Sequence, residues 1–381
     1  MAVSRSTLFF ALIALILCTL VFTLRVKKEM ADFEVNYQAG QRLYEGETLY
    51  RTSDGHWQFK YLPFSALLYL PLSFLPLGLA KACWFGLIVA ASVSIIVISS
   101  KLIDYKYDTF FSPVFVTVLV MGRYLFREVQ LGQINALITF LLLVMIWFLV
   151  RSESRSAVAA GGAIGGLATA LKPYAVIVFP YFAIRKRWPA LVTGSAVLSL
   201  AVLSPALFYG WKGNLIVLGE WRSSLAASTP FLFSSQDNIS LVGFLMKRTH
   251  NQNLSLIVYA IIVVLLGGLV LFLLLRGRRV SRASALDGFL ILALIPLVSP
   301  LGWDYTFLSF APAVMLICRH YGEYRPFWKG FLVMNLLVIS LSLHDLMGHR
   351  LYATFMSWSI LTLNFSSLVG YLAYLRIKGH A

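Results

Sequence analysis

The chain has 381 residues, of which 59% are hydrophobic and only 13% are charged. A soluble domain carries about 25% charged residues, and the mean hydropathy of this chain is +0.79. The composition therefore excludes a soluble enzyme, a secreted disulfide scaffold and a disordered tail, and it predicts a polytopic membrane protein. The apolar stretches are long and continuous, whereas the strands of an outer-membrane barrel alternate over about ten residues.

The charge balance is strongly basic, with 32 Lys and Arg against 16 Asp and Glu, a net charge of +16. In a soluble protein this would suggest nucleic acid as a partner. In a membrane protein, basic residues orient the spans, and we expect membrane lipids and no nucleic acid. The three cysteines lie inside apolar runs and show neither a disulfide framework nor a metal-ligand spacing.

The apolar runs predict an all-α membrane bundle of about twelve spans that forms one domain over residues 1–381. Twelve spans of about 20 residues each would use roughly 240 positions, which leaves room for two large polar loops. The predicted spans are Thr7–Leu24, Ala82–Ser100, Thr109–Phe126, Asn135–Val150, Ala157–Leu171, Tyr174–Ile184, Ala190–Tyr209, Leu254–Leu275, Ser284–Ser299, Asp304–Ile317, Trp328–Leu343 and Leu351–Leu375.

The distribution of Lys and Arg predicts the orientation of these spans. If the N-terminus is cytoplasmic, every basic cluster on a short connection after the first span also lies inside, as the positive-inside rule requires. The run Tyr61–Gly78 contains three prolines, which break helices. A full span there would also invert the early basic clusters relative to the late ones, so we expect an extracytoplasmic hairpin in the interface and not a span. Residues 25–81 and 210–253 then form two extracytoplasmic loops. About half of the basic residues would lie outside, where a ligand with phosphate charge would need them.

The first candidate site residue is Asp32, which follows the first predicted span and has Glu34 and Tyr37 close by in sequence. A carboxylate at the membrane surface can meet both a lipid-linked and a water-side substrate. As a general base for a sugar hydroxyl it would contribute about 10²- to 10⁴-fold in rate. The alternative interpretation is a solvated charge in a polar loop.

A second polar cluster lies between two predicted spans, in the segment GRYLFREVQLGQIN. It contains Arg123, Arg127, Glu128, Gln133 and Asn135. These side chains either form an interfacial collar or face a substrate.

Lys172 interrupts an otherwise apolar stretch and precedes Pro173. An ammonium near the bilayer centre costs about 2.5 to 3.5 kcal/mol, so we expect the helix to break at Pro173 and to place Lys172 at the outer interface. The glycines before it permit close helix packing, and they are Gly161, Gly162, Gly165 and Gly166.

The last cluster is the segment Ser299–Phe307, which links two short apolar runs and contains Trp303, Asp304 and Tyr305. Its polar side chains either line the site or snorkel to the interface. The six histidines show no spacing that would specify a metal.

These motifs together resemble glycosyltransferase family 87, integral-membrane enzymes of the GT-C fold. The resemblance covers about residues 30 to 310. It rests on Asp32-Phe33, Tyr37-Gln38-Ala39-Gly40, Leu43, Gly46, Leu49-Tyr50, Phe59, Tyr61, Pro63, Ala66-Leu67, Pro71-Leu72, Leu75-Pro76, Gly132-Gln133-Ile134-Asn135, Gly165, Leu167-Ala168, Leu171-Lys172-Pro173, Arg187-Trp188, Ser299-Pro300 and Trp303.

The resemblance implies a GT-C bundle whose first outer loop carries interfacial helices. It also implies inverting transfer of a sugar, most often mannose, from a polyprenyl-phosphate donor to a glycolipid or glycan acceptor. The reaction would take place on the extracytoplasmic side of the cell membrane.

The resemblance also implies the residues of the site. The family's catalytic carboxylate corresponds to Asp32, which would act as the general base. Lys172, Arg123 and Arg127 are candidates for a clamp on the donor phosphate. We expect the substrate to be lined by Glu34, Tyr37, Tyr61, Gln133, Asn135, Trp303, Asp304 and Tyr305.

One feature departs from the family pattern. Many members carry a histidine shortly after the Ser-Pro-x-x-Trp segment, where this chain has Asp304 and Tyr305. The identity of the second polar contributor therefore stays open. We expect no organic cofactor and no metal site, although a divalent ion that shares the donor phosphate stays open.

The main alternative function is a transporter or flippase of a lipid-linked or anionic solute. Such proteins show internal repeats and broken or acidic spans near the midplane, and no convincing repeat is visible. The polar residues also gather at one interface, which favours an enzyme. A structural subunit of an envelope-assembly complex is a third possibility, and it predicts that Asp32 can be replaced freely.

Overall fold

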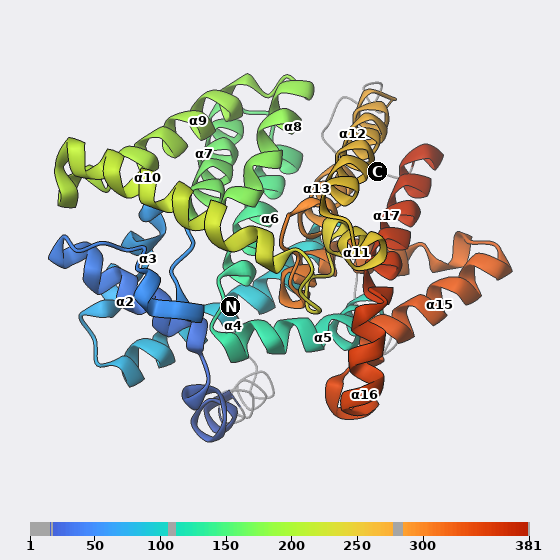
Figure 1. Cartoon of the computed structure of the whole chain (residues 1–381). Helices are drawn as coiled ribbons and strands as arrows, with labels where there is room; N and C mark the ends of the chain where they lie inside the picture. Colours follow the sequence, from blue (N-terminus) through green and yellow to red (C-terminus); the bar gives the residue numbers. More distant parts are fainter. Residues whose placement is uncertain (1–15, 17, 106–111, 277–284, 380–381) are drawn as a thin grey trace.

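The computed structural model describes residues 16, 18–105, 112–276 and 285–379, and these fold as helices with short connections (Figure 1). Within these ranges, the only β pairing is an isolated bridge between Asn238 and Trp303. The prediction of an all-α protein is therefore confirmed. Most of the first predicted span, Thr7–Leu24, lies outside the described residues.

The described helices are short and numerous. In chain order they are η1 (Val26–Lys28), α2 (Ala31–Glu45), η2 (Thr52–Trp57), α3 (Pro63–Ser73), α4 (Leu77–Leu102), α5 (Pro113–Leu131), α6 (Asn135–Arg151), α7 (Arg155–Leu171), η3 (Pro173–Ile177), α8 (Val178–Ile184), α9 (Trp188–Leu203), α10 (Ala206–Leu232), α11 (Leu241–Thr249), α12 (Gln252–Arg276), α13 (Ala285–Val298), η5 (Asp304–Phe310), α14 (Ala311–Arg319), η6 (Tyr321–Glu323), α15 (Pro326–Leu341), α16 (His344–Ser357) and α17 (Ile360–Lys378).

Only some of these helices have the length of a membrane span. Among the described residues, α4, α12 and α17 are long and apolar enough to cross a bilayer. Two consecutive pairs, α9 with α10 and α15 with α16, bend by 88° and 101° and raise the number to five if each pair is one broken span. The chain is thus a helical membrane protein, while the number of twelve spans stays a prediction.

The predicted outer segments are mostly helical. Residues 25–81 contain η1, α2, η2, α3 and the start of α4, and residues 210–253 contain most of α10 and all of α11. The prolines of Tyr61–Gly78 interrupt the chain less than expected. Pro63 occupies the first turn of α3, where a helix needs no N–H donor, and Pro71 lies two residues before the end of the helix, where it removes one N–H donor without ending the helix. Pro76 then precedes α4. This segment is thus one helix and a turn before α4, and its place in the membrane interface stays a prediction.

Helices α2 and α3 pack against one another on one side of the molecule, next to α10 (Figure 1). A small apolar cluster separate from the main core joins them, and it includes Leu43, Phe59, Ala66 and Val217. The hydroxyl of Tyr209 in α10 also donates to the carbonyl of Glu47 at 2.7 Å. These contacts fix the polar segment that carries Asp32 against the bundle.

The expected close packing at the glycines of α7 is confirmed. A Cβ atom on Gly162 would lie 2.2 Å from the carbonyl oxygen of Ala190, and one on Gly166 would lie 2.3 Å from that of Gly194. Only glycine permits this approach of α7 to α9. Lys172 directly follows α7 at the end of this closely packed pair.

Ion pairs join two sets of the helix ends that we expect in the cytoplasm. Arg151, which ends α6, donates to Asp104, which follows α4, at 2.6 Å. Arg185 after α8 and Arg376 in α17 both pair with the buried Asp287 of α13. These contacts are consistent with the predicted topology, whose sidedness stays a prediction.

Candidate active site

Four segments that are distant in sequence meet at Gln133, which is buried between α5 and α6. Its Nε2 donates to Oδ2 of Asp32 at 2.8 Å and to the hydroxyl of Tyr305 at 3.2 Å. Its Oε1 accepts a hydrogen bond from the hydroxyl of Tyr61 at 3.2 Å. The structure therefore brings together four of the residues expected at the site.

Gly132 explains why Asp32 lies next to Gln133. It ends α5 with φ +70°, a left-handed conformation that glycine adopts at no steric cost. A Cβ atom on Gly132 would lie 2.7 Å from the Cβ of Phe33. The absence of a side chain thus allows the first turn of α2 to approach the end of α5. The carbonyl of Gly132 is held in place by the indole of Trp84 at 2.9 Å.

The environment of Asp32 favours a basic carboxylate. The residue is half-buried in the first turn of α2, and burial raises the pKa of its carboxyl above the ordinary value. The hydrogen bond from Gln133 and the positive charges of Lys172 and Arg127 oppose this increase. A carboxylate with a raised pKa takes up a proton more readily than a fully solvated one, which suits a general base.

Lys172 lies in the break between α7 and η3, so the predicted interruption of the helix before Pro173 is confirmed. Its Nζ donates to Oδ1 of Asn135 at 2.5 Å. It also lies 5.3 Å from the ring centroids of both Tyr61 and Tyr174, close enough for cation–π attraction. Burial lowers the pKa of Lys172 to about 8, and the carboxylates of Glu128 and Asp32 limit this decrease.

Glu128 holds Asn135 from the other side. Its side chain is fully buried, Oε2 accepts from Nδ2 of Asn135 at 2.9 Å and Oε1 accepts from the backbone N–H of Ala136 at 2.7 Å. The sequence places Glu128 in a polar cluster but gives it no role, and Tyr174 is not expected either. The signal for Glu128 was a carboxylate close to the Gly-Gln-Ile-Asn motif and surrounded by apolar residues.

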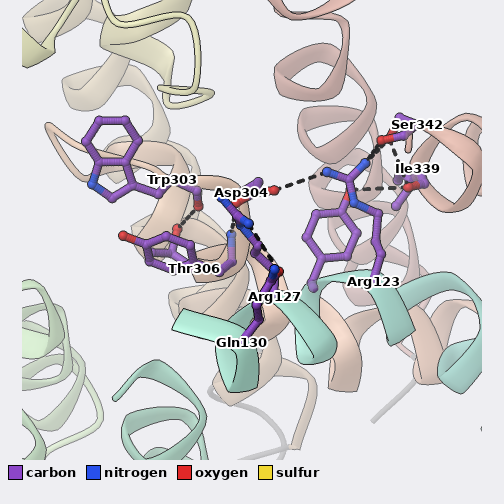
Figure 2. A network of polar contacts seen from close by, with 10 residues as sticks. Arg123, Arg127, Gln130, Trp303, Asp304, Thr306, Ile339 and Ser342 are labelled. Carbon is purple, nitrogen blue, oxygen red and sulfur yellow. Dashed lines mark hydrogen bonds and ion pairs between the residues drawn. The ribbon is translucent and has the colours of Figure 1, made fainter. Parts of the chain in front are cut away.

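Arg123 and Asp304 are engaged with one another. The guanidinium of Arg123 lies 3.1 Å from Oδ2 of Asp304 and also bonds the backbone and side chain of Ser342 (Figure 2). Oδ1 of Asp304 accepts from the backbone N–H of Tyr305 at 2.7 Å. Because its charge is already balanced, Arg123 is less available to a donor phosphate than Lys172. The pair orients η5 and thereby Tyr305.

The other expected site residues have different neighbours. Arg127 is exposed and bonds Gln130 at 3.1 Å (Figure 2), yet its charge acts on Asp32. Glu34 is turned to Lys81, at 2.6 Å. The hydroxyl of Tyr37 donates to the carbonyl of Leu75 at 2.8 Å, and Trp303 precedes η5 and pairs with Asn238. Their contact with a substrate stays a prediction.

Another cation lies near Asp32 that the sequence did not single out. Lys60 is half-buried, and burial lowers the pKa of its ammonium while the charge of Asp32 raises it. In the part of the chain that the structure describes, no three His, Cys, Asp or Glu side chains are grouped as metal ligands. The site thus consists of one carboxylate with a raised pKa, several cations and a group of hydrogen-bonded polar side chains.

The fold is that of a helical membrane protein. Its polar site contains a carboxylate, Asp32, that suits acid–base chemistry and an ammonium, Lys172, that suits phosphate binding. The model of glycosyltransferase family 87 matches residues 59–300. The chain belongs to this family.

Two characterised proteins are similar to it. One is a polyprenol-phosphate-mannose-dependent alpha-(1-2)-phosphatidylinositol pentamannoside mannosyltransferase of Mycolicibacterium smegmatis, 24% identical over 278 residues, which are 70% of this chain and 62% of that protein. The other is an alpha-(1->3)-arabinofuranosyltransferase of Corynebacterium glutamicum, 23% identical over 218 residues, which are 53% of this chain and 49% of that protein. The matched region thus spans less than two thirds of either relative. No solved structure is significantly similar to the chain.

Proposed function

We propose that the protein transfers a sugar, in the first instance mannose, from a polyprenyl-phosphate donor to a hydroxyl of a glycolipid or glycan. The reaction inverts the anomeric centre and takes place at the extracytoplasmic face of the cell membrane. The single observation that carries this proposal is the polar network of Asp32, Gln133, Asn135 and Lys172 in a chain of family 87, in which Nδ2 of Asn135 lies 3.5 Å from Oε1 of Gln133. One similar protein is named for a polyprenol-phosphate-mannose donor, which supports this donor class.

In the proposed reaction, Asp32 is the general base. The acceptor oxygen forms a bond to the anomeric carbon, and the bond from that carbon to the phosphate oxygen breaks. The electron pair of the broken bond leaves with the polyprenyl phosphate, and the proton of the acceptor hydroxyl passes to Asp32. Since Gln133 binds Oδ2 at 2.8 Å, we assign proton uptake to Oδ1.

Lys172 and Arg127 supply positive charge for the leaving phosphate. The ammonium of Lys172 has three N–H donors, of which Asn135 takes one. The two others can bind phosphate oxygens as negative charge develops on them, which is an electrostatic stabilisation of the transition state. A phosphate that leaves as an anion needs no proton, so one base and this clamp suffice. Arg123 contributes indirectly, through Asp304.

The substrate is lined on this proposal by the side chains next to Asp32, namely Tyr61, Gln133 and Tyr305. Asn135 was expected there too, but its side chain is 0% exposed, so it acts by supporting Lys172. Glu34, Tyr37, Trp303 and Asp304 would contribute from the rim. The two similar proteins are named for mannosyl and arabinofuranosyl transfer, so the identity of the sugar is the first property to test.

The test uses the full chain in lipid nanodiscs with radiolabelled polyprenyl-phosphate mannose and polyprenyl-phosphate arabinofuranose as separate donors. Membrane glycolipids and glycans serve as acceptors. We expect labelled acceptor from the mannose donor in the absence of any nucleotide sugar. Transfer from the arabinofuranose donor alone would refute the choice of sugar and retain the reaction class. If neither label is transferred while labelled lipid crosses proteoliposomes, the protein is a transporter and the proposal fails. Sealed vesicles of both orientations, supplied with an impermeant acceptor, test the sidedness.

A further inference from the structure

We propose that Glu128 is a positioning residue that sets the orientation of the Asn135 amide and, through it, the position of the Lys172 ammonium. This inference rests on the proposed function, since Lys172 is there the ligand of the donor phosphate. Glu128 is 0% exposed, so it touches no substrate and acts through its neighbours.

The hydrogen bonds of Glu128 leave one orientation for Asn135. Burial raises the pKa of Glu128 to about 7, so above that pH its carboxylate is ionised and only accepts hydrogen bonds. Glu128 receives them from Nδ2 of Asn135 and from the backbone N–H of Ala136. The amide nitrogen of Asn135 therefore faces Glu128, and its Oδ1 faces the opposite side. There it accepts from Nζ of Lys172 at 2.5 Å and from the hydroxyl of Tyr174 at 3.0 Å.

The reverse orientation of Asn135 would remove this support. Its NH₂ group would then face the ammonium of Lys172, which is also only a donor. Two donors repel one another, so the ammonium would leave its place between the rings of Tyr61 and Tyr174. Donor binding would weaken, although Asp32 would keep its bond from Gln133.

Replacement of Glu128 by glutamine tests this orientation without a change in size. A glutamine has one donor group and one acceptor, whereas the site needs two acceptors. If its NH₂ faces Ala136, two donors meet, and if it faces Asn135, the Asn135 amide must rotate. We expect Glu128→Gln to raise the donor KM about tenfold, the effect of one lost charge-assisted hydrogen bond, with a smaller change in kcat.

A second substitution should restore the arrangement. In the double variant Glu128→Gln with Asn135→Asp, the new glutamine donates to the new carboxylate and accepts from Ala136, while that carboxylate accepts from Lys172 and Tyr174. The donor KM should return to within about threefold of the wild-type value, about 0.7 kcal/mol. Asn135→Asp alone sets two carboxylates against one another and should impair the enzyme.

The pH dependence gives a readout that a merely structural role would not move. The groups that face Lys172 are the carboxylates of Asp32 and Glu128 and the rings of Tyr61 and Tyr174. In the double variant the nearest carboxylate touches Lys172 directly. The rise of the donor KM on the alkaline side should therefore move to higher pH than in the wild-type protein.

The matched control is Glu323→Gln, which removes an exposed carboxylate that pairs with His320 at 2.7 Å. We expect this variant to have the wild-type KM and kcat.

The outcomes separate the two proposals. A wild-type protein that transfers sugar from no donor refutes the proposed function. An active wild type whose donor KM is unchanged in Glu128→Gln overturns the positioning role alone. A double variant that does not recover the donor KM, whether it is unfolded or folded, overturns it too, because Glu128 would then support only the fold.

Discussion

The environment of Lys172 predicts how donor binding depends on pH and on this side chain. Burial lowers the pKa of Lys172 to about 8, so the ammonium is charged at neutral pH and loses its charge just above it. If the charged form of Lys172 binds the donor phosphate, the donor KM should rise about tenfold per pH unit above about pH 8. The donor KM rises with pH because the group that loses its charge is the Lys172 ammonium, which binds the phosphate, and not the general base Asp32.

The substitution Lys172→Met removes the charge and retains a long unbranched side chain between Tyr61 and Tyr174. A hydrogen bond to a charged group contributes about 1.5 to 3 kcal/mol, which corresponds to about a 10- to 150-fold increase in donor KM at neutral pH. The alkaline rise of KM should disappear at the same time, because no titrating ammonium is left.

The assay is the initial rate of sugar transfer at varied donor concentration from about pH 6 to about pH 10, in nanodiscs, for both proteins. The thermal unfolding midpoint of each protein serves as the control for folding. A folded Lys172→Met variant with an unchanged donor KM at neutral pH would refute the phosphate contact. Persistence of the alkaline rise in that variant would show that another group titrates.

Two further substitutions test the structural supports of the site. Gly132→Ala should lower stability by about 1 to 3 kcal/mol and reduce transfer, because φ is +70° and the new Cβ would lie 2.7 Å from that of Phe33; wild-type thermal unfolding and wild-type transfer would contradict this. Arg123→Met leaves Asp304 without its ion-pair partner and should lower the unfolding midpoint while the donor KM changes less than about threefold; a large increase in KM with an unchanged midpoint would instead favour direct phosphate binding by Arg123.

The sequence predicted the parts of the fold that follow from local rules. Apolar runs and the Lys-Pro dipeptide predicted an all-α chain and the break before Pro173, because helix formation and its interruption by proline depend on nearby residues. The tight contact of α7 and α9 followed from the glycine spacing. The prolines of Tyr61–Gly78 were given too much weight, because their cost depends on their position within a helix, which a sequence does not show.

The site was predicted in composition more than in geometry. Asp32, Gln133, Asn135, Lys172 and Tyr305 were expected, and they lie in one network. Which side chains bind one another depends on tertiary contacts that no sequence spacing reports. The pairing of Arg123 with Asp304, the ion pair of Glu34 with Lys81 and the hydrogen bond from Asn135 to Glu128 are of this kind.

The measurement that tests the central claim most directly is the kcat of Asp32→Asn for transfer from the polyprenyl-phosphate donor, compared with wild type at equal amounts of folded protein. The asparagine oxygen can still accept from Gln133, so folding and donor KM should be retained. A loss of about 10²- to 10⁴-fold in kcat is expected from the removal of the general base. The matched control is Asp54→Asn, in the same predicted loop, where the carboxylate pairs with Arg42, and we expect it to keep the wild-type kcat. A folded Asp32→Asn variant that transfers sugar at the wild-type rate would contradict the account.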